Sequence, residues 1–164
     1  MKLFKKILDF VQALTEYVLY FLVTTMVVIV FAQVIFRFVL RAALPWSEEA
    51  ARYIMVWMSM LGASIGIRRK AHIGIEAVVT LLPAYQKKAV GIGATVITIT
   101  FFTGMIYYGF VLLRVVGMQT SPAMEINMAI PYSSLVAGGA LMLLYSVEEL
   151  FSQLTGLREK GDAL

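Results

Sequence analysis

Four long stretches of the chain contain no charged residue, and charged residues bound each of them. They cover residues 17–36, 53–67, 89–113 and 126–147. A helix needs about 20 mainly apolar residues to cross the roughly 30 Å hydrocarbon layer of a bilayer. A surface helix of a water-soluble protein would instead carry charged residues along one face. The pattern therefore predicts an all-α integral membrane protein with four transmembrane helices.

The residues that flank these stretches complete a single membrane domain over residues 1–164. We predict its transmembrane helices at about residues 16–38, 47–68, 88–114 and 129–150. Residues 1–15 carry apolar side chains at helical spacing with lysines opposite, which predicts an amphipathic interfacial helix that runs into the first span. An ordinary basic flank is the alternative. Residues 73–82 predict a short amphipathic cytoplasmic segment between the second and third helices, stopped by Pro83.

Basic residues are divided unequally between the two sides of this predicted domain. The two tails and the loop between the second and third helices hold ten of them, and the opposite side holds four. Because cytoplasmic segments carry the excess of Lys and Arg, we expect both termini in the cytoplasm. The first apolar stretch is longer than the core of a signal peptide, so we expect it to stay as the first helix.

Composition narrows the possible functions. Hydrophobic residues make up 60% of the chain, and the formal net charge of +4 suits contact with anionic phospholipids. The basic residues are scattered among loops, so nucleic acid is not an expected partner. The chain has no cysteine and one histidine, His72. We therefore expect neither a thiolate metal site nor a bis-histidine haem on this chain.

The positions of the charged residues also argue against chemistry inside the bilayer. No predicted span has a charged residue near its middle, whereas carriers that bind ions themselves usually place one there. Glu48 and Glu49 are adjacent and would point about 100° apart on a helix, which is a poor geometry for two carboxylates that act on one bond. His72 lacks a second His or Cys, so an interfacial structural role is favoured over that of a general base. We therefore expect that this chain is not an enzyme and that it carries no catalytic, substrate-binding or metal site.

The start of the second helix carries the densest group of polar residues. Trp46 is placed to anchor the helix at the membrane interface. Ser47 is predicted to cap the helix, which puts Glu48 and Glu49 in its first turn. Arg52 follows them by four and three residues and can pair with either. We treat this group as a candidate for structural or partner contacts.

Two further groups are candidates for the same role. Gln33 and Arg37 share a face of the first helix. Arg37 either extends to lipid headgroups or joins a polar cluster with the glutamates of the second helix or with a partner chain. Gly62 and Gly66 have the spacing that lets two membrane helices approach closely, within the chain or between subunits. The adjacent glycines 138–139 are likewise expected to thin the fourth helix for packing.

Several of these residues occur in an order that resembles a known family. They are Gln33-Val-Ile-Phe-Arg37, Trp46-Ser-Glu-Glu49, Arg52, Trp57, Leu61-Gly-Ala63, a basic pair, His72-Ile73, Thr120-Ser-Pro-Ala123, Ile130-Pro-Tyr132 and Gly138-Gly-Ala-Leu-Met142. Over about residues 15–150, the chain resembles the small membrane subunit of tripartite ATP-independent periplasmic (TRAP) transporters. The resemblance implies four helices with both ends in the cytoplasm of a bacterial inner membrane.

The resemblance also implies partners and a function. A periplasmic binding protein would deliver an organic acid, such as a C4-dicarboxylate or a sialic acid, to a large sodium-coupled membrane subunit. The small subunit would brace the large one and help to form the docking face, with Trp46, Glu48, Glu49 and Arg52 organising the outer end of its second helix. Any sodium ions would bind the large subunit, and this chain would need no cofactor. A self-contained small oligomeric transporter or channel is the alternative.

Overall fold

A computed structural model describes residues 2–69 and 84–155 of the chain. Within these ranges the protein is all-helical, as predicted, and four helices are long and apolar enough to cross a membrane. They are α1 (Lys2–Phe38), α2 (Pro45–Arg68), α4 (Ala84–Val116) and α5 (Ala129–Thr155). The predicted amphipathic segment at residues 73–82 lies outside the described residues, and so does His72.

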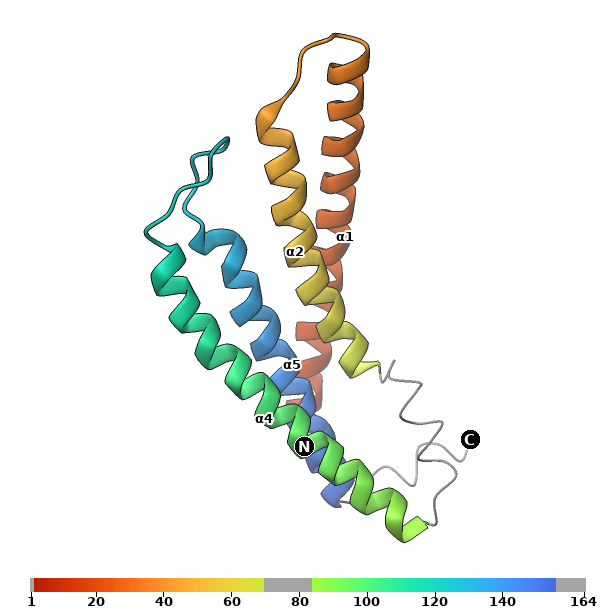
Figure 1. Cartoon of the computed structure of the whole chain (residues 1–164). Helices are drawn as coiled ribbons and strands as arrows, with labels where there is room; N and C mark the ends of the chain where they lie inside the picture. The colour runs from red at the N-terminus through yellow and green to blue at the C-terminus, as the bar shows by residue number, and fades with distance from the viewer. Residues whose placement is uncertain (1, 70–83, 156–164) are drawn as a thin grey trace.

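The first helix differs in length from the span that the hydrophobic pattern defines. Its 37 residues correspond to about 55 Å at 1.5 Å per residue, well beyond the hydrocarbon layer. The residues predicted as an interfacial helix form the first turns of this one unbroken helix (Figure 1). Their placement at the membrane surface stays a prediction.

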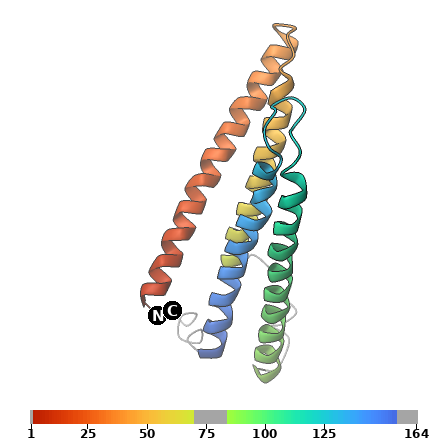
Figure 2. The ribbon, with the colours of Figure 1, turned by 90° about the vertical axis from the view of Figure 1, so that its left-hand side faces the viewer.

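The four helices form two antiparallel pairs, whose connecting segments lie at the same end of the bundle (Figure 1). We call this the loop end, and the opposite end, where α1 begins and α5 ends, the terminal end. The main contacts join α4 to α5, α5 to α2, and α2 to α1. The helices therefore stand in the order α1, α2, α5, α4, and Figure 2 shows α1 diverging from the others toward the terminal end.

Adjacent glycines place α5 between its two neighbours. A Cβ atom on Gly138 would lie 2.7 Å from the Met60 Cβ atom of α2. A Cβ atom on Gly139 would lie 2.8 Å from the Met105 Cε atom of α4. Because apolar side chains gain little by leaving lipid for a helix interface, close backbone approach at small residues is a main source of contact in membranes. The predicted role of these two glycines is confirmed.

The glycine pair of α2 does not have this role within the chain. A Cβ atom added at Gly62 or Gly66 would meet no atom within 4 Å in the described part of the chain. The prediction of intimate packing against a helix of the same chain is therefore wrong for these glycines. The contact with α5 is made through Met60 instead. A contact of Gly62 and Gly66 with another subunit stays a prediction.

Candidate functional site: the two polar ends of the bundle

The cap of the second helix lies at Leu44, and the helix itself begins at Pro45, before the predicted Ser47 cap. Leu44 is the cap residue, and Pro45 occupies the first turn, where its missing N–H leaves no hydrogen bond unmade. The Ser47 hydroxyl, already inside the helix, donates to the Leu44 carbonyl oxygen over 2.7 Å. The predicted cap is therefore wrong. Trp46 lies beside Pro45 with 44% of its surface exposed.

The two glutamates at this end have different partners. Arg52 donates to the Glu48 carboxylate over 3.2 Å, as the four-residue spacing predicts, and both side chains are largely exposed. The Glu49 carboxylate instead accepts hydrogen bonds from the backbone N–H groups of Ala123 and Met124, over 3.2 and 3.1 Å. Glu49 thereby connects the start of α2 to the segment between α4 and α5.

Two aromatic residues extend this connection along the same face of α2. The Tyr53 hydroxyl lies 3.4 Å from the Met128 sulfur, and the Trp57 indole N–H donates to the Ile130 carbonyl oxygen over 3.3 Å. Glu49, Tyr53 and Trp57 are spaced four residues apart, so they share one helix face. We call these three residues the loop-end contact face. The even spacing of hydrogen-bonding side chains was the available signal, although nothing in it identified a partner more than 70 residues away.

The segment between α4 and α5 is itself ordered by local hydrogen bonds. The Asn127 side chain donates to the Gly117 carbonyl oxygen and accepts from the Ala129 N–H, both over 2.8 Å. It thus joins the end of α4 to the start of α5. Glu125 adopts a left-handed backbone conformation, with φ of 55°, which lets the segment turn sharply. Glu49 therefore contacts a defined turn.

Gln33 and Arg37 lie near the same end but outside this network. The Arg37 guanidinium carbon lies 6.0 Å from the centre of the Phe38 ring, and both residues are exposed. Among the described residues, Arg37 forms no ion pair with Glu48 or Glu49. The predicted cluster with these glutamates is therefore wrong within this chain. A contact of Gln33 or Arg37 with headgroups or a partner stays a prediction.

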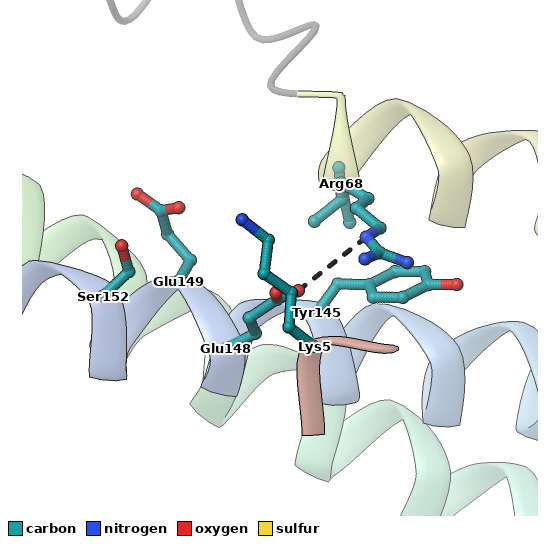
Figure 3. Close-up of a pocket in the computed structure, with 7 residues that line it drawn as sticks. Lys5, Arg68, Tyr145, Glu148, Glu149 and Ser152 are labelled. Carbon is teal, nitrogen blue, oxygen red and sulfur yellow. Dashed lines mark ion pairs between the residues drawn. The ribbon is translucent and has the colours of Figure 1, made fainter. Parts of the chain in front are cut away.

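The terminal end carries a second set of polar contacts, which the sequence did not predict. Arg68, near the end of α2, donates to Asp9 of α1 over 2.5 Å and to the Leu8 carbonyl oxygen. Its Nε atom lies 3.8 Å from the Glu148 carboxylate of α5, and its guanidinium lies over the Tyr145 ring (Figure 3). Only 10% of the Arg68 side chain is exposed. One arginine of α2 thus contacts two other helices, α1 and α5.

The next arginine makes a separate contact with α1. Arg69 donates to the Glu16 carboxylate over 2.8 Å, and Gln12 donates to the same carboxylate oxygen over 2.7 Å. We call Asp9, Glu16, Arg68, Arg69 and Glu148 the terminal-end charge cluster. Beside it lies an open pocket of about 270 Å³, lined by Lys5, Ile67, Arg68, Tyr145, Glu148, Glu149 and Ser152. No group of three or more metal-ligating side chains occurs in the described ranges.

Comparison with known proteins identifies the family. Residues 26–156 match the model of the family described as tripartite ATP-independent periplasmic transporters, DctQ component. The chain belongs to this family. The match runs from the middle of α1 to the end of α5. It includes the loop end, and at the terminal end it includes Arg68, Arg69 and Glu148, whereas Asp9 and Glu16 precede it. The resemblance stated from the sequence is confirmed.

Curated relatives agree with the DctQ assignment. The C4-dicarboxylate TRAP transporter small permease protein DctQ of Vibrio cholerae is 28% identical over 60% of this chain and 42% of its own length. Its namesake from Rhodobacter capsulatus is 31% identical over 66% of this chain and 48% of its own length. The isethionate TRAP transporter permease protein DctMQ of Oleidesulfovibrio alaskensis is 28% identical over 82% of this chain but 23% of its own length.

The matches cover less than half of each of these three relatives. All three are named as permease proteins of transporters. Together with the four apolar helices, the DctQ match identifies this chain as a small permease component and a multi-pass membrane protein, not an enzyme.

Proposed function

We propose that this chain is the bracing subunit of a TRAP transporter that imports an organic acid across the bacterial inner membrane. It packs against a large membrane subunit, which carries the acid together with sodium ions. The observation that supports this role most directly is the DctQ match over residues 26–156. It agrees with the sequence pattern, in which the charged residues of the four candidate membrane spans all lie toward the ends of the spans.

The length of one relative supports the proposed large partner. The part of the DctMQ permease that aligns with this chain is 23% of that protein, so most of that protein lies outside the alignment. We propose that a separate large subunit supplies the corresponding function here. The sodium ions would then bind the large subunit, and this chain would carry no cofactor.

The substrate class follows from the names of the relatives. They include transporters of C4-dicarboxylates, isethionate and sialic acid, all of which are organic anions. A C4-dicarboxylate or a sialic acid is the proposed cargo. A periplasmic binding protein would bring it to the loop end of the bundle, where residues 39–44 and 117–128 form the two connecting segments. Glu49 would support this docking face by fixing the second of these segments.

A reconstitution experiment tests this proposal. The tagged chain is expressed with and without a candidate large subunit, and both preparations are placed in liposomes with a sodium gradient and a substrate-loaded binding protein. We expect co-purification of the two membrane subunits and uptake only when both are present. Uptake by this chain alone would instead favour a self-contained oligomeric transporter or channel. A chain that associates with no larger membrane protein would contradict the bracing role.

The proposed orientation has its own test, which the absence of cysteine makes simple. Met118→Cys introduces a thiol at a residue that is 90% exposed in the segment between α4 and α5. Phe4→Cys introduces one near the start of α1, at the opposite end. A membrane-impermeant maleimide is expected to label the first variant in spheroplasts and the second only after lysis. The reverse pattern would contradict the placement of both termini in the cytoplasm.

A further inference from the structure

We propose that Arg68 and Arg69 set the position of α1 relative to α2 and α5, and that the terminal-end charge cluster acts as the positioning device of this helix. The inference goes beyond the proposed transport function and does not depend on it. Its evidence is the distribution of buried side chains on α1, the spacing of the residues that the arginines contact, and the connectivity of the cluster.

The first helix has little apolar packing to define its position. Of its 37 residues, the structure buries only Leu8 and Thr15 among those whose side chains are described. Large apolar residues along the rest of the helix are mostly exposed, as expected for contact with lipid or a partner. In a bilayer, such a face gains little by turning toward one neighbouring apolar helix over another. The position of α1 must therefore depend strongly on contacts of another kind.

The residues that the arginines contact lie on the same side of α1. Asp9 and Glu16 are seven residues apart, which is nearly two full turns, so they project from one face about 10 Å apart along the axis. Leu8 and Thr15, the two buried residues, have the same spacing and directly precede them. Adjacent arginines at the end of α2 therefore contact two successive levels of one stripe on α1. This arrangement defines both the rotation of α1 and its height along α2.

Arg68 adds the connection to the rest of the bundle. Its guanidinium lies 5.1 Å from the centre of the Tyr145 ring and approaches Glu148, so its position is defined by α5 as well as by α2. A planar guanidinium suits this place because it can donate in several directions while stacking on an aromatic ring. At this end α1 diverges from the other helices (Figure 2), and the long side chains of Arg68 and Arg69 reach its carboxylates. Arg68 thus links the position of α1 to that of α5.

The proposal predicts that loss of these contacts moves α1 and leaves the other helices in place. The remaining helices keep the glycine contacts of α5 with α2 and α4, which involve no residue of the charge cluster. The chain has no cysteine, so pairs of spin labels can be placed at will. Phe10 on α1 and Phe151 on α5, both well exposed, report the position of α1. Ile97 on α4 and Phe151 form the control pair.

The experiment measures label distances by pulsed electron paramagnetic resonance on the 164-residue chain in lipid nanodiscs. In Arg68→Gln combined with Arg69→Glu, we expect the Phe10–Phe151 distribution to shift and broaden, while the Ile97–Phe151 distribution stays as in the parent chain. Arg69→Glu alone should give a smaller shift, and adding Glu16→Arg should reverse it, because the exchanged pair restores the ionic contact. Such a rescue by charge exchange would not follow from a general loss of packing.

Arg52→Gln is the matched control substitution. It removes an arginine of the same helix whose ion-pair partner, Glu48, also belongs to α2, so within the described residues no ion pair to a second helix is lost. Both distance distributions should stay unchanged in this variant. An unchanged Phe10–Phe151 distribution in the double arginine variant would overturn the proposal. It would also be overturned if both label pairs changed together, or if the Glu16→Arg exchange gave no recovery.

Discussion

The two ends of α2 join it to the rest of the bundle by different kinds of contact. At the loop end, Glu49 and Trp57 bind backbone groups of the neighbouring segment and of α5. At the terminal end, Arg68 and Arg69 bind carboxylates of α1. Backbone groups are present whatever the side chain, whereas a carboxylate is supplied by a particular residue. The loop-end contacts therefore depend on the shape of the turn, and the terminal-end contacts on matched charges.

Removing Arg68 should give the largest effect and would test the terminal end directly. We expect Arg68→Ala to lower the free energy of unfolding by about 2–3 kcal/mol, since it removes charge-assisted hydrogen bonds from a mostly buried site. Both tryptophans of the chain lie on α2, so their fluorescence during denaturant titration in detergent measures the loss. Arg68→Lys should be intermediate, because lysine keeps the charge but not the fork of donors. Parent-like stability of the alanine variant would contradict this ranking.

Removing the Glu49 carboxylate should break the loop-end contact. Glu49→Ala is expected to cost about 1–2 kcal/mol, because the Ala123 and Met124 N–H groups lose a charged acceptor. Hydrogen exchange at these two amides should become faster than in the parent chain. Glu48→Ala is the matched control and should leave both amides protected, since Glu48 pairs within α2. Combining the two substitutions should impair assembly or uptake only as much as Glu49→Ala alone.

Trp57→Phe should give a smaller effect at the same end. The substitution keeps an aromatic side chain and removes the indole N–H that donates to the Ile130 carbonyl oxygen. We expect a loss of about 1 kcal/mol, typical of one neutral hydrogen bond. Tyr132→Phe, which removes the hydroxyl of an exposed tyrosine near the same helix start, serves as the comparison. Equal melting temperatures of the Trp57 variant and the parent chain would exclude a contribution of this bond.

Arg52→Ala should give the smallest effect of the four substitutions. Its ion pair with Glu48 is exposed on both sides, at 61% and 71%, and connects residues of the same helix. Exposed pairs of this kind contribute about 0.5 kcal/mol or less. A loss as large as that of Arg68→Ala in the same titration would show that burial and helix-to-helix connection do not distinguish the two arginines.

The sequence revealed features that depend on local spacing or on the bilayer. Four helices could be predicted because charged residues are excluded from long stretches. The Glu48–Arg52 pair could be predicted because residues four apart meet on a helix. The close approach at Gly138 and Gly139 could be expected because small residues thin a helix, although the neighbours of α5 could not be named.

The contacts between distant residues were beyond prediction for a physical reason. In a bilayer nearly every face of a helix is apolar, so the hydrophobic pattern does not indicate which helices are neighbours. Arg68 meets Asp9 across 59 residues, and Glu49 meets Met124 across 75. The seven-residue spacing of Asp9 and Glu16, together with two adjacent arginines, was the only local sign of the charge cluster. The Gly62 and Gly66 spacing pointed to close packing that is not made within the described part of this chain.

The order of the helices in space has a consequence for synthesis of the protein. The helix that lies between α2 and α4 is α5, which the ribosome produces after the other three described helices. Until α5 enters the membrane, α2 has α1 as its only main neighbour and α4 has none in the described chain. The bundle is therefore completed in a single late step, when the glycines of α5 meet both neighbours at once. A nascent chain stopped before Ala129 would therefore leave α4 without its main neighbour in the described chain.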